Sequence, residues 1–200
     1  MTGRGPLPLR LTRIAGRLIL STFFRLSVAG LSHVPRKGGF VLLPKHQRWE
    51  DVPLLGLAVP RPLHYVAKHE LFLNPLSRRF FTALGGIPLN RARPLESRPF
   101  LRIVTGLLRE GEGIVVFPEG TYYPGLMGPG RQGIVRMIRR RVPVSFVPVG
   151  IRYGETGIRR PVRIAFGRPI QGGAGMEEGA FFSAVMAEIA RLSGLEGGGA

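Results

Sequence analysis

The segment VLLPKHQRWEDVPLLG, residues 41–56, joins two apolar runs through a short polar stretch. A continuous apolar run that stops at polar groups is typical of a strand buried on both faces. The second run carries Pro53 at its start, which is typical of the first turn of a helix. We therefore predict a strand at 39–44 and a short helix at 52–59, with the polar residues in the loop between them.

A histidine and an aspartate stand in this loop. Asp51 is the only aspartate in the chain and follows His46 by five residues. In a regular helix, five residues would place the two side chains about 140° apart, so they do not form a same-face helical pair. If the chain turns between them, the carboxylate can orient the imidazole as a base. The alternative is that Asp51 only caps the helix, which the spacing alone favours.

Short apolar runs alternate with helical patterns along the rest of the chain. Further strands are predicted at 63–67, 86–90, 113–118, 142–153 and 161–167, and further helices at 71–84, 97–111, 131–141 and 177–194. This order predicts an α/β fold with a mainly parallel central sheet flanked by helices. Sites in such sheets lie beyond the carboxyl ends of the strands, which places His46 and Glu119 in candidate site loops.

Composition narrows the possible functions. The chain has 200 residues, which suggests one domain, and it has no cysteine, which excludes disulfides, thiol nucleophiles and Cys-ligated zinc. A chain without cysteine also fits a cytosolic setting. The net charge of +17 favours a polyanionic partner such as nucleic acid, an anionic membrane or an acidic carrier protein.

The amino terminus carries a basic pattern. Within residues 7–28, Arg10, Arg13, Arg17 and Arg25 share one face of a predicted amphipathic helix. The arginines interrupt the apolar run that a spanning helix needs, so we favour a helix in the membrane interface with its arginines on the headgroups. The alternative is a helix packed on its own domain. The predicted division is a membrane-associating helix at 1–30, a folded domain at 31–194 and a flexible tail at 195–200.

Two further stretches place polar groups at strand ends. In IVVFPEGTYYPG, residues 114–125, Glu119, Gly120 and Thr121 follow a strand; they form either a ligand site or an ordinary turn. In LGGIPLNRARP, residues 84–94, Arg91 and Arg93 either grip a phosphate or form a solvated pair.

The sequence offers no nucleophile of its own for the His46–Asp51 pair. Cysteine is absent and no serine lies in a G-x-S-x-G elbow. His64 and His69 have no carboxylates at metal-site spacing, so no metal is predicted. If the pair is catalytic, the nucleophile is expected to be a substrate hydroxyl.

Taken together, these motifs resemble the glycerolipid acyltransferase family. KHQRWED resembles the family's N-H-x-x-x-x-D motif, GIPLNR its G-x-I-x-x-x-R block, FPEGT its third motif and VPVGI its fourth. YVAKHELF, residues 65–72, also resembles the family's link from the second strand to the next helix. The order and spacing match over roughly residues 30–170 and reverse the preference for a simple helix cap at Asp51.

The resemblance implies an O-acyltransferase in which His46 deprotonates a lysolipid hydroxyl and Asp51 orients His46. The hydroxyl would attack an acyl thioester, acyl-CoA or acyl-ACP, with no acyl-enzyme and no other cofactor. The implied substrate-binding residues are Arg91, Glu119, Gly120 and Thr121, with Lys68 and Arg131 at the rim. The implied setting is peripheral, on the cytoplasmic face of the cell membrane, with 1-acylglycerol-3-phosphate as the first choice of acceptor.

The chain departs from the family pattern beside these motifs. Lys45 replaces the usual Asn, Arg48 the common Ser, and Tyr122-Tyr123 an Arg-Ser pair that includes a phosphate ligand. Acceptor choice is expected to differ at these positions, with Arg48 as a replacement phosphate ligand.

Three other functions stay open. They are acylation of another lysolipid or amphipathic alcohol, hydrolysis of an ester, and binding of nucleic acid by a basic module. Against the last, the arginines are spread along the chain and are not interleaved with aromatic residues, so nucleic acid is not expected as a partner.

Overall fold

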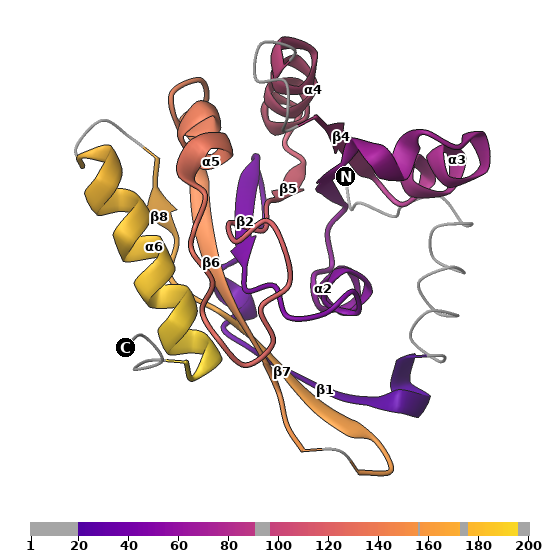
Figure 1. Ribbon diagram of the computed structural model, residues 1–200. Helices are drawn as coiled ribbons and strands as arrows, with labels where there is room; N and C mark the ends of the chain where they lie inside the picture. Colours follow the sequence, from indigo (N-terminus) through magenta and orange to yellow (C-terminus); the bar gives the residue numbers. More distant parts are fainter. Residues whose placement is uncertain (1–19, 91–96, 156, 173–175, 196–200) are drawn as a thin grey trace.

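The computed structural model describes residues 20–90, 97–155, 157–172 and 176–195, which form an α/β fold around one sheet (Figure 1). The strands are β1 (Phe24–Ala29), β2 (Phe40–Pro44), β3 (Leu63–Lys68), β4 (Gly86–Leu89), β5 (Gly113–Val115), β6 (Ser145–Tyr153), β7 (Arg160–Phe166) and β8 (Ile170–Gln171). The helices are α2 (Asp51–Ala58), α3 (Pro75–Ala83), α4 (Ser97–Arg109), α5 (Gln132–Arg139) and α6 (Glu178–Ser193), with 3-10 turns η1 (Leu31–His33) and η2 (His69–Phe72).

The predicted mainly parallel sheet is confirmed. The strand order is β1-β7-β6-β2-β5-β3-β4, and β8 pairs with β6. The β1–β7, β2–β6, β2–β5, β3–β5 and β3–β4 pairs are parallel, whereas β6 pairs antiparallel with β7 and β8. The antiparallel pairing arises because the chain returns directly from β6 to β7 without a crossover helix.

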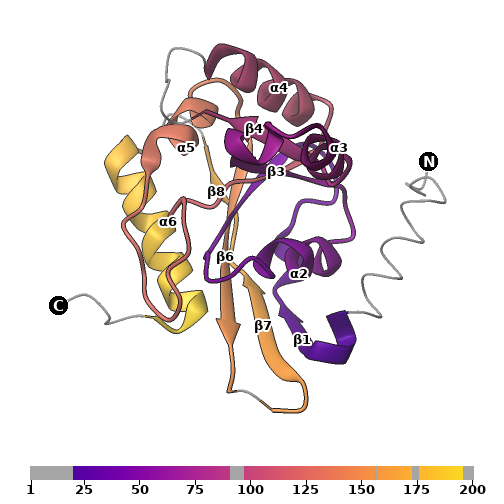
Figure 2. The same cartoon turned by 45° about the vertical axis from the view of Figure 1, so that its right-hand side comes forward.

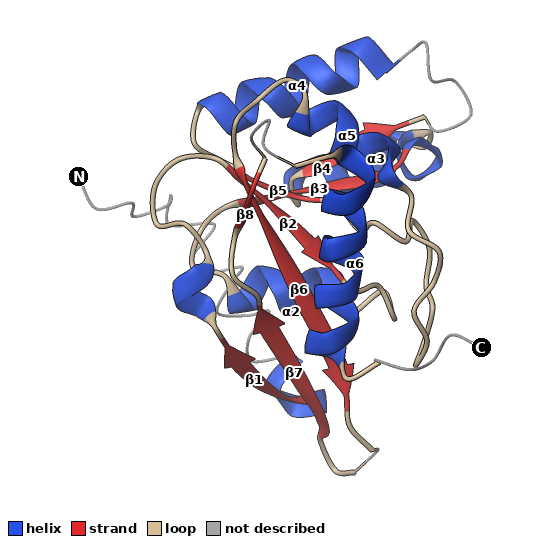
Figure 3. Cartoon of the chain, turned by 90° about the vertical axis from the view of Figure 1, so that its left-hand side faces the viewer, coloured by secondary structure: helices blue, strands red, loops and turns tan. Residues whose placement is uncertain are grey.

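The sheet is apolar on both faces because helices cover both. Along β2, Val41 and Leu43 join a cluster with side chains of α4, α5 and α6. Phe40 and Leu42 point the other way and join a cluster with side chains of α2 and β7. Figure 1 shows α2 on the opposite side of the sheet from α5 and α6, and Figure 3 shows α6 lying across its own face. A strand between two such layers needs an unbroken apolar sequence, as the 39–44 prediction assumed.

The prediction of one helix over 7–28 is wrong at its carboxyl end. Residues 20–23 are helical, but Phe24–Ala29 form β1, paired in parallel register with Arg160–Ala165. The sequence FRLSVA alternates apolar and polar residues, and this period of two outweighs the helical pattern once a strand edge is available. Arg25 is therefore a strand residue, and the sheet begins before the predicted boundary at residue 30. Residues 7–19 lie outside the described residues.

Smaller differences lie at element ends. The predicted helix 71–84 divides into η2 and α3 because Asn74 caps a new helix, its side chain accepting the Leu76 N–H, and Pro75 follows at the first position. The strand predicted at 113–118 ends at Val115, and the one predicted at 142–153 begins at Ser145. β8 was not predicted, since two residues carry no periodic signal.

No helix within the described ranges is both long and apolar enough to span a bilayer.

The contact between α6 and β6 is close at Gly150. A Cβ atom at this position would lie 2.4 Å from the carbonyl carbon of Leu192 in α6. Because that neighbour is helix backbone, the contact cannot be relieved by a side-chain rotation. The close packing of α6 on β6 therefore depends on glycine, which has no side chain, at position 150.

We predict that Gly150→Ala lowers the free energy of unfolding by about 1–3 kcal/mol through overpacking. The matched control is Gly106→Ala in α4, where an added Cβ would meet no atom within 4 Å. That change is expected to raise stability by about 0.5–1 kcal/mol because alanine favours a helix interior. Urea unfolding of the two variants measures both values, and an equal effect at the two sites would contradict the close α6–β6 contact.

Candidate active site

The candidate site lies where two neighbouring parallel strands end. β2 and β5 pair in register, with Phe40 opposite Gly113 and Leu42 opposite Val115. His46 follows the end of β2, and Glu119 lies in the loop after β5. The sheet thus brings together two polar segments that are more than seventy residues apart in sequence, as the strand-end argument predicted.

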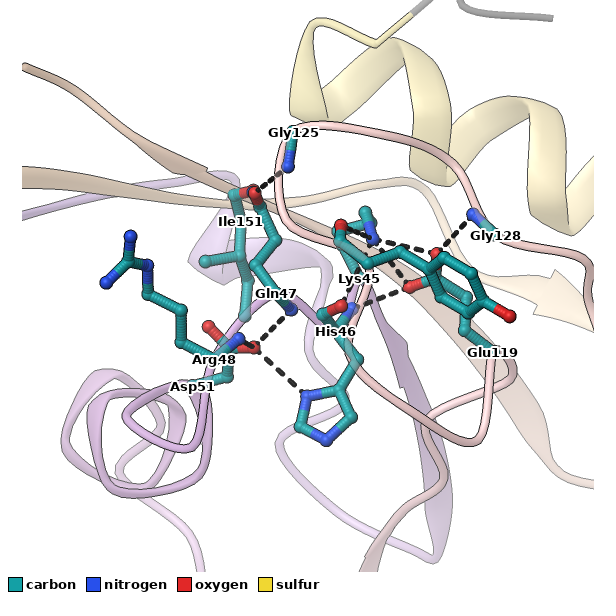
Figure 4. A network of polar contacts seen from close by, with 10 residues as sticks. Lys45, His46, Gln47, Arg48, Asp51, Glu119, Gly125, Gly128 and Ile151 are labelled. Carbon is teal, nitrogen blue, oxygen red and sulfur yellow. Dashed lines mark hydrogen bonds and ion pairs between the residues drawn. The ribbon is translucent and has the colours of Figure 1, made fainter.

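His46 and Asp51 are in contact. Nδ1 of His46 lies 3.0 Å from Oδ2 of Asp51 (Figure 4). An ionised carboxylate can only accept, so this contact assigns the ring proton to Nδ1 and leaves a lone pair on Nε2. In Figure 4, Nε2 lies on the ring edge away from the polar network. The arrangement has the two parts of a general base, namely an imidazole and a carboxylate that fixes its tautomer.

Asp51 is fully buried, and its carboxylate collects several donors. Oδ2 also accepts the backbone N–H groups of Gln47 at 2.6 Å and Arg48 at 2.8 Å. Oδ1 accepts the hydroxyl of Tyr153 at 2.7 Å. The alternative of a simple helix cap is therefore wrong, because Asp51 turns back to the preceding loop and Glu50 holds the cap position.

Two aromatic rings hold the imidazole from its sides. The ring of His46 stacks on Phe117 with centroids 3.7 Å apart and planes 25° apart. Tyr122 packs against it at 4.4 Å, tilted by 59°. Only 12% of the His46 side chain is exposed. The ring therefore has little freedom beyond the orientation that Asp51 sets, and Tyr122, which stands where the family has Arg, serves as packing for the histidine.

A buried ion pair lies beneath the histidine backbone. Nζ of Lys45 donates to Oε1 and Oε2 of Glu119 at 2.7 and 2.8 Å, and both side chains have no exposed surface. Oε2 of Glu119 also accepts the backbone N–H of His46 at 2.8 Å, and Oε1 accepts that of Gly128 at 2.7 Å. Burial lowers the pKa of Lys45, and the Glu119 carboxylate opposes this change. The pair locks the end of β2 to the loop after β5.

The loop after Thr121 folds over the histidine segment. Nζ of Lys45 donates to the carbonyl of Tyr123 at 2.8 Å, and the Tyr123 N–H donates to the carbonyl of His46 at 2.9 Å. The side chain of Gln47 accepts from the Gly125 N–H at 2.9 Å and donates to the Ile151 carbonyl in β6 at 2.6 Å. The histidine segment is thus held from both neighbouring strands.

These positions correct two expectations. Lys45 was expected to influence acceptor choice, and Glu119 to contact the acceptor. Both are buried and satisfied by each other and by backbone groups, so they shape the site from beneath its surface. The carboxylate of Glu119 has no free face to offer a ligand in this geometry.

The other predicted residues that the structure describes lie around the same edge of the sheet. Arg48 lies beside the pair, but its guanidinium extends away from the imidazole and lies 5.4 Å from the centre of the Tyr153 ring (Figure 4). Gly120, at a φ of 71°, and the exposed Thr121 form the turn after Glu119. Lys68 is exposed at the end of β3, and Arg131 is exposed immediately before α5. Arg91 lies outside the described residues.

Sequence reasoning missed Tyr153. It lies at the end of β6, and burial together with the nearby Asp51 charge raises the pKa of its hydroxyl, which therefore stays protonated and remains a donor. Arg48 and Arg160 lie 5.4 and 5.5 Å from its ring centre. Its position at a strand end was the available signal, but nothing in the sequence connects it to Asp51.

An apolar hollow borders the helix that Asp51 begins. It has a volume of about 480 Å³ and lies between β1 and α2, with Phe24, Leu26, Leu54 and Ala58 in its lining. Arg25 and Arg159 also line it. Among the described residues, no three His, Asp or Glu side chains gather as a metal site would require.

Comparison with known proteins relates the chain to lipid enzymes. It is 35% identical over 106 residues to the 1-acyl-sn-glycerol-3-phosphate acyltransferase of Bacillus subtilis (strain 168), covering 52% of each chain. The Pseudomonas aeruginosa PAO1 protein of the same name is 33% identical over 135 residues, covering 66% of this chain and 51% of that one. A lyso-ornithine lipid O-acyltransferase of the same organism is 29% identical over 154 residues, covering 76% and 57%. The chain spans about half the length of the first two relatives.

The fold also has a solved counterpart. The 1-acyl-sn-glycerophosphate acyltransferase PlsC of Thermotoga maritima superposes with a TM-score of 0.74 at 22% identity, covering 96% of this chain and 81% of that one. At this identity the likeness establishes the fold alone. The Acyltransferase family model matches residues 25–152, which include β1, the His46–Asp51 pair and most of β6. The chain belongs to the acyltransferase family, of the glycerolipid type.

Proposed function

We propose that this protein transfers a fatty acyl group from an acyl thioester to the hydroxyl of a lysophospholipid, with 1-acylglycerol-3-phosphate as the first candidate. The observation that carries the proposal is the His46–Asp51 contact at 3.0 Å, with Nε2 of the imidazole turned away from the network. A histidine base with no cysteine anywhere in the chain suits a reaction in which the substrate brings the nucleophile.

This geometry supports the following step. Nε2 of His46 takes the proton of the acceptor hydroxyl as its oxygen attacks the thioester carbonyl. The buried Asp51 carboxylate stabilises the imidazolium that forms, without itself becoming protonated. The carbon–sulfur bond then breaks, and the leaving thiolate takes the proton from Nε2 as free thiol. No acyl-enzyme forms, and the histidine ends in its starting tautomer.

The family supports a lipid acceptor, and the headgroup is the finer part of the proposal. Relatives named for 1-acyl-sn-glycerol-3-phosphate and for a lyso-ornithine lipid both match this chain. The apolar hollow of about 480 Å³ beside α2 supports a substrate with an acyl chain. Arg48, Lys68 and Arg131 remain candidate headgroup contacts, since each is at least partly exposed at the carboxyl edge of the sheet. The net charge of +17 suits an anionic donor, either coenzyme A or acyl carrier protein.

The first test removes the base. We expect His46→Ala or Asp51→Asn to lower kcat at least about 100-fold, the usual range for loss of general-base catalysis. Release of free thiol from acyl-CoA, with lysophosphatidate or lyso-ornithine lipid in vesicles, measures the rate. His64→Ala is the matched control, because His64 is partly exposed near the start of β3, at the other end of the strands.

Three outcomes would decide against the proposal. Full activity in the His46→Ala variant would contradict the role of His46 as the general base. Thiol release that needs no acceptor would favour a hydrolase. Retarded migration of DNA at physiological salt, with no acyl transfer to any acceptor, would favour the nucleic-acid module.

A second test addresses Tyr153, whose hydroxyl holds the Oδ1 oxygen of Asp51. We expect Tyr153→Phe to lower kcat about tenfold with little change in KM, because a hydrogen bond to a charged group contributes about 1.5–3 kcal/mol.

Tyr65→Phe is the control for this test. Its hydroxyl donates to the Val52 carbonyl of α2 at 3.1 Å, so the change also removes a tyrosine hydroxyl that contacts this helix, but not one that contacts the carboxylate. An equal fall of kcat in both variants, or no fall in Tyr153→Phe, would assign Tyr153 a purely structural part.

A further inference from the structure

Helix α3 presents an unusual amount of apolar surface. None of its residues is buried, and the exposed fractions are 81% for Leu76, 59% for Phe80 and 55% for Leu84, which caps the helix. Leu73, immediately before the helix, is 66% exposed. Single exposed leucines are ordinary on protein surfaces, but four large apolar side chains on one short segment form a patch.

The patch is a stripe along one side of the helix. Leu76, Phe80 and Leu84 follow one another at four-residue intervals, so they lie within about 80° around the helix axis. Residues on other sides of the helix hold it to the protein. There Phe81 packs against Phe72 with centroids 5.8 Å apart, and Nε of Arg78 donates to the Phe72 carbonyl at 3.0 Å. The stripe therefore points away from the domain.

The charges beside the stripe favour an anionic occupant. Arg79, about 100° from Phe80 around the helix axis, is exposed beside the stripe, and α3 has no acidic residue. If two copies of this chain met through their stripes, arginines would face arginines without a carboxylate from either helix. An apolar stripe on a helix whose charged residues are all arginines is instead the pattern of a helix that lies in a bilayer interface containing acidic lipids.

The position of α3 connects the stripe to the candidate active site. The helix follows β3 through η2, so it begins near the carboxyl edge of the sheet, where His46 lies. Figures 1 and 2 show α3 on the same side of the sheet as α2, whose first residue is Asp51. A bilayer on this side would bring its acceptor lipids to the face that α2 forms.

We propose that the stripe of Leu76, Phe80 and Leu84, together with the neighbouring Leu73, is a membrane contact that binds the protein to anionic bilayers. The surface is distinct from the amino-terminal segment considered from the sequence. This inference rests on the proposed function only for the purpose that the contact serves, because binding to a membrane does not require the acyl transfer reaction.

The first experiment measures binding. The double variant Leu76→Ser with Phe80→Ser should reduce cosedimentation with phosphatidylcholine–phosphatidylglycerol vesicles at least about tenfold, since each side chain removes apolar area that the interface would bury. Arg79→Gln should weaken binding about fivefold on the same vesicles and little on phosphatidylcholine alone. The thermal midpoint should stay close to that of the wild type, because these side chains are exposed.

The matched control removes the same kind of surface elsewhere. Ile158 and Met176 are 103% and 45% exposed and lie before β7 and α6, away from α3. Ile158→Ser with Met176→Ser should leave vesicle binding unchanged. Equal losses in the two double variants would show a general effect of surface hydrophobicity and would overturn the proposal.

A second measurement reports where the stripe lies. Because the chain has no cysteine, Leu76→Cys supplies one labelling site for an environment-sensitive fluorophore, and Ile158→Cys supplies the control. Vesicles should shift the emission of the label at 76 to shorter wavelength and leave the label at 158 unchanged. A shift at 76 that grows with protein concentration without lipid would indicate a second copy as the occupant and would overturn the membrane assignment.

The outcome can be separated from that of the proposed function. The α3 double variant should lose activity on acceptors in vesicles but keep it on a short-chain lysolipid dispersed as monomers. If vesicle binding depends on the stripe while no acceptor is acylated, the result supports the membrane contact and contradicts the proposed reaction. If acylation on vesicles proceeds unchanged in the double variant, the result supports the proposed reaction and contradicts the membrane contact.

Discussion

The candidate site depends on the buried carboxylate of Asp51, whose hydrogen-bond partners in the described part of the chain include no lysine or arginine side chain. Asp51 has no exposed surface, and a charge in that position is tolerated only if hydrogen-bond donors replace the lost water. The donors are two backbone N–H groups of the loop, the imidazole of His46 and the hydroxyl of Tyr153. The same contacts that satisfy the charge also bend the loop, orient the ring and connect α2 to β6. Stability and site geometry therefore rest on one group.

A second buried charge explains how the residue before His46 can depart from the family pattern while the histidine keeps its place. Lysine at position 45 would be costly at zero exposure on its own, but Glu119 lies at hydrogen-bond distance with both oxygens. The carboxylate then has capacity left for the N–H groups of His46 and Gly128. A small polar residue at 45 could not reach across in this way. The substitution thus changes how the loop is anchored, whereas the imidazole still meets Asp51.

The sequence predicted what depends on local pattern. The alternation of apolar strands and amphipathic helices predicted the mainly parallel sheet. The polar residues at strand ends identified His46 and Glu119 as candidates for the site loops. Contacts that depend on distant partners could not be predicted in this way. The segment of β1 was predicted as helix because its partner β7 lies more than a hundred residues away in the sequence. Only pairing with β7 makes the alternation of apolar and polar residues in β1 favour a strand. Tyr153 and the burial of Glu119 were missed for the same reason. The resemblance assigned Glu119 to the acceptor, whereas Lys45, also noted as a departure, occupies it.

The length of the side chain explains why position 51 holds an aspartate and position 119 a glutamate. Asp51 must accept from N–H groups three and four residues before it and from a ring five residues before it, all within the turn that it closes. Its single methylene keeps the carboxylate against that turn, and a glutamate would carry it past these donors. Glu119 has the opposite task, since its carboxylate spans the gap between two strand ends to meet Lys45, His46 and Gly128. An aspartate there would fall short of at least one of them. The one aspartate of the chain stands where the shorter side chain is required, and a glutamate stands where the longer one is.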